Sequence, residues 1–140
     1  MYKQNPILCE NSNRVSLSLL YFGYAKVGSN WKGSHPGLDF SLLYYIVSGS
    51  AEIYSDEQVF TLEAGNWYLI PAGMPFRYNC QDHMEHIYFH LKLCGLDRMD
   101  LLRIFGVPCK LKPQEDMSGF LMDSMESRDI TDSIKIKNIV

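Results

Sequence analysis

The sequence contains no uninterrupted apolar stretch of the roughly 18 residues that a membrane-spanning helix requires. Its first residues, MYKQNPILCENSN, also lack the long apolar segment of a secretory signal. These two absences predict a cytoplasmic protein with no membrane partner.

Positive charge and paired cysteines are equally scarce. The chain carries 13 Lys and Arg against 16 Asp and Glu, and its basic residues are scattered, whereas DNA-contacting domains usually present a basic surface. We therefore expect no DNA-binding surface in these residues. The absence of a CxxC pair argues against a zinc knuckle or a redox motif. We expect the four cysteines to be reduced and to pack as small apolar side chains: Cys9, Cys80, Cys94 and Cys109.

Motifs for covalent and phosphate chemistry are missing as well. The sequence has no GxSxG serine, no cysteine placed with a local histidine in a protease pattern, and no glycine-rich phosphate loop. We therefore expect no enzyme activity, no catalytic residue and no cofactor.

What the sequence does contain is a series of short β-type segments separated by glycine, proline and polar turns. Asp56 and Glu57 predict a hairpin, and Ser48-Gly49 predicts a break between two strands. Such closely spaced strands predict a closed barrel or a double-sheet fold. The expected strands cover residues 15–27, 38–49, 50–55, 58–65, 66–71, 75–80 and 84–95, with a loop over 28–37.

After residue 95 the apolar residues change to helical spacing. A helix is expected over 96–105, with Gly106 as its stop, and two more over 113–127 and from Asp129 or Thr131 onward. The fold class predicted is therefore mainly β, followed by two or three C-terminal α-helices. The last apolar period has no stop signal at Val140, so either the chain was cut from a longer protein, which we expect, or it ends naturally there and docks on a partner.

The stretch GNWYLIPAGMPFRY, residues 65–78, places two glycines and two prolines in an otherwise apolar and aromatic run. Gly65 and Gly73 permit the positive φ of tight corners, and Pro71 and Pro75 fix φ there. We infer strands joined by tight corners in a small barrel. The strands are apolar because one face lines the lumen and the other is covered.

The spacing of this stretch, Gly, five residues, Pro, one residue, Gly, resembles the second conserved motif of the cupin superfamily. Together with DFSLLYYIVSGSAEIY upstream, it is similar to the N-terminal effector-binding domain of AraC-type transcription regulators. The resemblance covers residues 15–95 and implies a cupin-like jelly-roll barrel there. It further implies an N-terminal arm over 1–14 and a helical dimerisation and linker segment over 96–140.

Many cupins hold a metal through an HxH pair, a glutamate and a histidine of the second motif. Aligned on these motifs, the four positions hold His35, Gly37, Leu42 and Phe76, so one ligand of four remains. One imidazole does not hold a divalent metal, because such sites need three or four ligands. This departure implies no metal and argues against a cupin dioxygenase or isomerase.

The segment HMEHIYFH, residues 83–90, also contains three histidines. On a strand, His86 and His90 share a face with Tyr88, and His83 lies opposite. Residues four apart on a strand are separated by about 13 Å, which is too far for one metal ion. These histidines are either polar side chains satisfied by neighbours or contacts to a ligand, and both interpretations stay open.

The resemblance implies a small-molecule effector in the lumen, with a carbohydrate as the default. Aromatic faces stack on a sugar, and tyrosine hydroxyls and imidazoles fix its orientation by hydrogen bonds. If the last strand shifts in register by two residues, Met84 and His90 replace their neighbours. For each aromatic residue, plain core packing is the alternative. The predicted ligand-binding residues are Tyr78, His86, Tyr88, His35, Phe76 and Tyr44.

The resemblance also implies partners. Residues 1–14 either fold over the ligand, with Pro6, Ile7 and Leu8 as an apolar plug, or form a disordered tail. The C-terminal helices would form a homodimer, and DNA would be bound only through a helix-turn-helix domain that follows Val140. Two alternatives remain, a stand-alone cupin enzyme and a non-catalytic cupin-like binding module.

Overall fold

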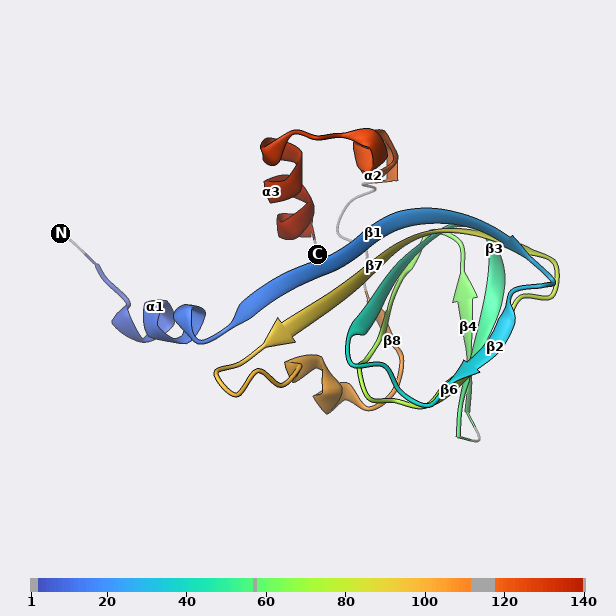
Figure 1. Ribbon diagram of the computed structural model, residues 1–140, viewed down its shortest axis with the longest axis horizontal. Coiled ribbons are helices and arrows are strands. Elements are labelled where there is room, and N and C mark those ends of the chain that lie inside the picture. The colour runs from blue at the N-terminus through green and yellow to red at the C-terminus, as the bar shows by residue number, and fades with distance from the viewer. Residues whose placement is uncertain (1–2, 57, 112–117, 140) are drawn as a thin grey trace.

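The structure, a computed structural model, describes residues 3–56, 58–111 and 118–139. Within these residues, eight strands pair in an antiparallel network and curve into a barrel (Figure 1). The predicted mainly β barrel followed by C-terminal helices is confirmed. The strands are β1 (Ser16–Gly28), β2 (Lys32–His35), β3 (Ser41–Ser55), β4 (Gln58–Glu63), β5 (Trp67–Ile70), β6 (Phe76–Asn79), β7 (His83–Cys94) and β8 (Cys109–Leu111).

Strand β3 belongs to both layers of the barrel. Its first half pairs with β5 and β7, and its second half pairs with β4 and β6. The prediction of a strand break at Ser48-Gly49 is wrong, because the chain stays paired there and only shifts register between Ile46 and Ser48. Gly49 adopts φ 72°, and a Cβ there would lie 2.1 Å from the carbonyl oxygen of His83. The pair therefore marks a bend within one strand.

Two short strands were not predicted. Strand β2 lies inside the expected loop 28–37 and pairs with β6, and β8 pairs with β5. The predicted hairpin between β3 and β4 is confirmed, since Ser55 pairs with Gln58 and Asp56 adopts φ 52°. Short strands of this kind depend on a distant partner rather than on their own periodicity.

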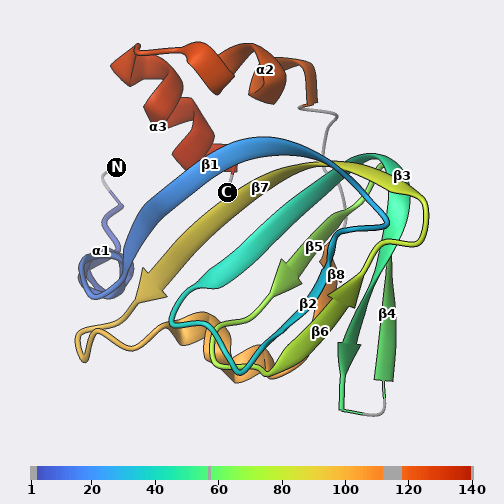
Figure 2. The same cartoon turned by 45° about the vertical axis from the view of Figure 1, so that its right-hand side comes forward.

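The barrel has apolar residues on two faces of its main sheet, as predicted for the apolar strands. The inner set lies between the layers and includes Tyr44, Ile53 and Met84. The outer set lies on the back of β3, β5 and β7 and packs against Leu121 and Ile136 from the C-terminal helices. Figure 2 shows these helices above the outer face of β1 and β7. The lumen and the helices thus lie on opposite faces of the same strands.

The prediction of a helix over residues 96–105 is wrong for residues 96–100. Residues after β7 form a turn, and Asp100 bridges back to Cys94 before a short 3₁₀ helix, η1 (Leu101–Phe105), begins. The side chain of Asp100 caps η1 by accepting from the Leu102 amide at 2.9 Å, so the helix starts there. Gly106 ends it with φ 66°, as predicted.

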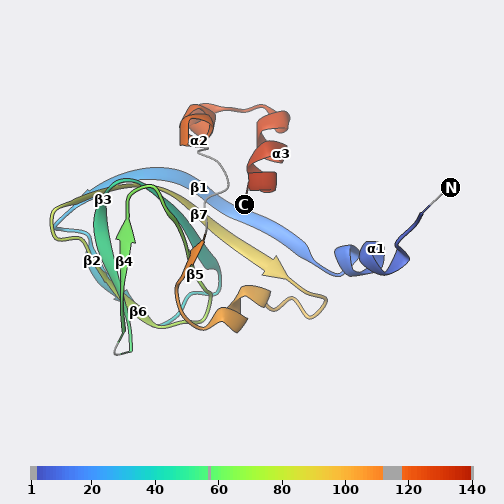
Figure 3. The same cartoon turned by 180° about the vertical axis from the view of Figure 1, so that it is seen from behind.

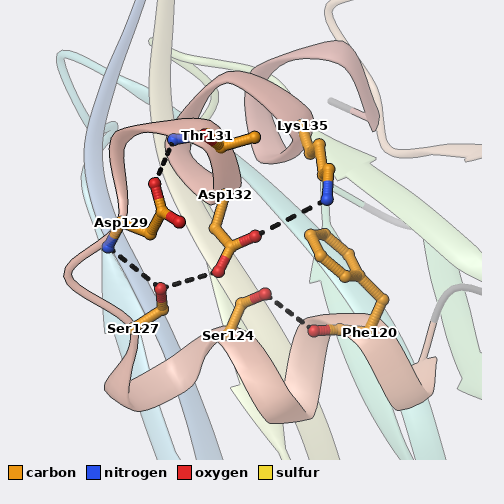
Figure 4. A network of polar contacts seen from close by, with 7 residues as sticks. All are labelled: Phe120, Ser124, Ser127, Asp129, Thr131, Asp132 and Lys135. Carbon is orange, nitrogen blue, oxygen red and sulfur yellow. Dashed lines mark hydrogen bonds and ion pairs between the residues drawn. The ribbon is translucent and has the colours of Figure 1, made fainter.

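The C-terminal helices are α2 (Ser118–Asp123), the 3₁₀ turn η2 (Ser124–Glu126) and α3 (Ile130–Ile139). Residues 113–117 of the second expected helix lie outside the described residues. Asp129 caps α3 by accepting from the Thr131 amide at 2.8 Å, as one of the two predicted caps. Figure 4 shows how Ser127 joins Asp129 to Asp132 and so braces the corner between the helices. None of the described helices is long and apolar enough to cross a membrane.

At the other end, α1 (Pro6–Asn13) forms within the predicted N-terminal arm. The Asn5 side chain caps it by accepting from the Leu8 amide at 3.0 Å, and proline begins it. The helix projects away from the barrel at the start of β1, with Ile7 and Leu8 exposed (Figures 1 and 3). The described part of the arm, residues 3–14, does not cover the lumen, and closure of the arm over a ligand stays a prediction.

Candidate functional site

The candidate site is a row of aromatic and imidazole rings along the inner face of the barrel, which we call the ring row. One end is formed by β2 and β6. His35 lies 5.2 Å from Phe76 and 5.6 Å from Tyr78, measured between ring centroids. Tyr78 then contacts Trp31 at 4.5 Å. Strand β2 pairs with β6 opposite these residues, so the pairing that sequence reasoning missed builds this end.

Trp31 leads to the centre of the row. Its ring lies 5.9 Å from that of His86, which lies 4.9 Å from Tyr44 and 5.9 Å from Tyr88. Tyr44 and Tyr88 are cross-strand partners on β3 and β7. Every one of the six predicted site residues therefore lies in this row, on four different strands. That they bind a ligand stays a prediction.

The far end of the ring row is built by His90. Its ring stacks on Phe40 at 4.7 Å and contacts Tyr88 at 5.4 Å. The sequence predicts His90 only as a substitute, and it does not predict Trp31 or Phe40. Trp31 lies in a turn-rich segment and Phe40 just before a strand, so no alternation of apolar and polar residues indicates that either side chain faces the lumen. The one available signal is that each is an aromatic residue next to a predicted lumen strand.

Two glycines make room for the tyrosines. A Cβ on Gly33 would lie 2.6 Å from the Tyr78 hydroxyl oxygen, and one on Gly23 would lie 2.4 Å from the Tyr88 hydroxyl oxygen. Gly23 and Tyr88 are paired across β1 and β7, and Gly33 and Tyr78 across β2 and β6. Each tyrosine ring thus lies over the backbone of its neighbouring strand, and any side chain at the glycine would displace it.

His86 is the most unusual polar group in the row. It is 3% exposed, and its Nδ1 has no hydrogen-bond partner among the described residues. Burial lowers its pKa from the usual 6.5 to about 4, because the imidazolium would lose its hydration. Burial also lowers the pKa of His90 and raises that of Tyr44. At neutral pH His86 is therefore a neutral imidazole and Tyr44 a neutral phenol.

A surface hollow of about 450 Å³ opens beside His35 and Phe76. Arg77 lies at its wall with its guanidinium carbon 5.5 Å from the centre of the Tyr54 ring, and Tyr54 donates a hydrogen bond to Glu52. The β2–β6 end of the ring row thus borders solvent-accessible space.

The described residues bring no three His, Cys, Asp or Glu side chains together in an arrangement that could hold a metal ion. His86 and His90 do lie on the same face of β7, as predicted, but each contacts the ring of Tyr88 between them. What this arrangement can do chemically is stack on a flat face and exchange hydrogen bonds with a neutral polar guest.

Solved structures with a similar chain path are distant in sequence. The EutQ protein of Clostridium difficile is 17% identical, covering 59% of this chain and 69% of that chain, with a TM-score of 0.46. A cupin-2 domain protein of Shewanella frigidimarina is 21% identical over 53% and 78%, with a TM-score of 0.44. A predicted oxalate decarboxylase of Thermotoga maritima is 16% identical over 54% and 78%, with a TM-score of 0.43. Likenesses this weak carry no argument about the ligand.

A search of curated proteins found no match. The model of one family, described as the AraC-like ligand binding domain, matches residues 15–126. This span contains every strand of the barrel and the first of the two C-terminal α-helices. It also contains the whole ring row. The chain therefore belongs to the AraC-like ligand-binding domain family.

Proposed function

We propose that this chain is the effector-sensing and dimerisation domain of an AraC-type transcription regulator, and that its effector is a carbohydrate bound along the ring row. It acts by binding and carries out no catalysis. The observation that carries the proposal is the buried Nδ1 of His86, which lacks a partner among the described residues and is surrounded by rings.

A buried polar atom without a partner costs about 1–3 kcal/mol, so a guest hydroxyl that bonded to it would gain that amount. The neighbouring rings of Trp31, Tyr44 and Tyr88 offer flat apolar faces around the same atom. A sugar presents hydroxyls at its rim and C–H groups on its faces, and so matches both features. The neutral state of His86 further favours an uncharged guest at this position.

A thermal-shift screen with neutral monosaccharides tests the effector. A sugar that binds only the folded chain raises its melting temperature, and its affinity can then be measured by calorimetry. Tyr78→Phe and Tyr88→Phe each remove one hydroxyl from the row, and we expect about tenfold weaker binding. Tyr24→Phe is the matched control, because Tyr24 packs with the outer apolar set. A sugar whose affinity falls equally in the control is not bound in the ring row.

The C-terminal helices support the dimerisation part of the proposal. Leu121 and Ile136 pack against the outer face of the barrel and are buried there, whereas Ile130 is 76% and Ile134 57% exposed. We expect Ile130→Glu and Ile134→Glu to convert a dimer to a monomer in sedimentation experiments. Val59→Glu, at an exposed apolar residue of β4, should leave the assembly unchanged. A monomeric starting protein would contradict the dimer.

DNA binding is assigned to a helix-turn-helix domain outside residues 1–140. Tight and specific binding of an operator by these residues alone in a gel shift would contradict this assignment. The competing proposal is a cupin enzyme, and bound metal in purified protein together with turnover would favour it.

A further inference from the structure

A second, smaller hollow lies at the end of the barrel where β7 finishes. It has a volume of about 280 Å³ and is distinct from the hollow beside His35. Figure 2 shows η1 beneath this end of β7, next to the loops that join β2 to β3 and β5 to β6. We call it the arginine hollow. Its lining consists of Asp39, Lys92, Arg98, Met99, Asp100 and Arg103.

Both carboxylates of the arginine hollow already have partners. Asp39 accepts from the Lys92 ammonium at 2.9 Å, and this contact lowers the pKa of its carboxyl group. Asp100 is 6% exposed, and its two oxygens accept from the Leu102 amide at 2.9 Å and from the Ser41 hydroxyl at 3.2 Å. Neither acid therefore needs a further cation.

The two arginines, in contrast, form no ion pair with any described residue. The lining thus contains three cationic side chains, Lys92 and the two arginines, and two carboxylates that already have partners. This leaves the hollow with an excess of one positive charge. A guanidinium offers a planar fork of donors that fits the oxygens of a carboxylate or phosphate. Both arginines are exposed, and their donors are therefore accessible to an anion from solution.

The backbone places both arginines at this hollow. Arg98 adopts φ 62°, a left-handed conformation that is unfavourable for a long side chain, at a turn closed by its amide donating to the Gly95 carbonyl at 3.1 Å. Arg103 lies on η1 and packs over Gly73, where a Cβ would come within 2.8 Å of its Nη1. Gly73 therefore leaves room for the guanidinium at the β5–β6 corner, where Arg103 lines the arginine hollow and also a neighbouring hollow that includes Gly73.

We propose that the arginine hollow binds a small oxyanion, a phosphate or carboxylate group, between Arg98 and Arg103. The group has two possible sources. It is either a free ion, or the acidic group of an effector whose remainder lies on the ring row. His90 and Phe40 stack on each other at the far end of the ring row. Lys92 lies two residues after His90 on β7, and Asp39 directly precedes Phe40, so the hollow adjoins this end of the row. Only the second source rests on the proposed function.

Inorganic phosphate is the probe for the site. We expect phosphate to raise the melting temperature of the chain above that in sodium chloride of equal ionic strength, with saturation. Arg98→Gln and Arg103→Gln should each weaken phosphate binding about tenfold, as expected for losing hydrogen bonds between charged groups. Arg128→Gln, at an exposed arginine outside the hollow, is the matched control.

Circular dichroism and the melting temperature without phosphate establish that each variant folds. Phosphate that acts no differently from chloride overturns the proposal. The proposal is also overturned if Arg128→Gln weakens phosphate binding as much as Arg98→Gln and Arg103→Gln do.

Glucose and glucose 6-phosphate separate the two sources. If the anion belongs to an effector, the sugar phosphate binds more tightly than inorganic phosphate, and both Arg103→Gln and Tyr88→Phe weaken it. If the site takes a free ion, the two phosphates bind equally and Tyr88→Phe has no effect. Phosphate binding without any sugar binding in the screen would leave the arginine hollow standing while the proposed carbohydrate function fails.

Discussion

The buried imidazole of His86 makes the stability of the chain depend on pH. Its pKa is about 6.5 when unfolded and about 4 when folded, because burial removes hydration from the charged form. The stability linked to His86 is therefore fully present above pH 6.5 and is lost as the pH falls towards 4. In this window the unfolded chain binds a proton that the folded chain excludes.

The size of the effect follows from the two pKa values. At pH 5 the linkage costs about 2 kcal/mol of unfolding free energy, and at pH 6 about 0.8 kcal/mol. His86→Phe keeps a ring against Trp31, Tyr44 and Tyr88 but has no titrating nitrogen. We therefore expect the loss of stability between pH 7 and pH 5 to be about 2 kcal/mol smaller in this variant than in the parent chain.

Urea denaturation at pH 7, 6 and 5, followed by circular dichroism, measures this difference. Other titrating groups, including His90, are present in both proteins and cancel in the comparison. The overall stability of His86→Phe can shift because phenylalanine is larger, but that shift is the same at each pH. His83→Phe is the control, since its side chain is 59% exposed. An unchanged slope in His86→Phe would refute a buried, neutral His86.

Three further changes probe other parts of the structure. Leu121→Ala should cost about 3 kcal/mol in urea denaturation, because this side chain is fully buried between α2 and the barrel, whereas the exposed Met122→Ala should cost little. Ser41→Ala should cost about 2 kcal/mol by the same measurement, since the buried Ala72 amide loses its acceptor at 2.9 Å. Gly33→Ala should alter the near-ultraviolet dichroism of the aromatic residues, because the added methyl displaces Tyr78 from Trp31; an unchanged spectrum would contradict the tight approach.

Most strands of the barrel could be predicted because their signals are local. Glycine, proline and Asp56 mark the corners, and apolar residues fill the segments between them. The pairing could not be predicted, because β2 and β8 exist only through their partners β6 and β5. The bend at Gly49 was misread for the same reason. Glycine indicates that the chain turns, and only the continued pairing with β7 shows that it remains one strand.

The candidate site shows the same division between local and distant information. Alternation along β7 predicts correctly that His86, Tyr88 and His90 share a face. Their assembly into a row with Trp31 and Phe40 depends on contacts between segments far apart in the sequence. The arginine hollow was also beyond sequence reasoning. A helix over residues 96–105 was expected there, and the actual turn places Arg98 and Arg103 around one hollow instead.

Alternation along the strands also determines how an effector could influence the rest of the chain. Tyr44 and His86 face the lumen, while their neighbours Tyr45 and Ile87 belong to the outer set that packs with the C-terminal helices. A guest on the ring row would therefore be separated from the proposed dimerisation helices by the thickness of one strand. Binding changes the helices only if their alternative positions differ in affinity for the guest. The strength of any such coupling would equal that difference in affinity, expressed as a free energy.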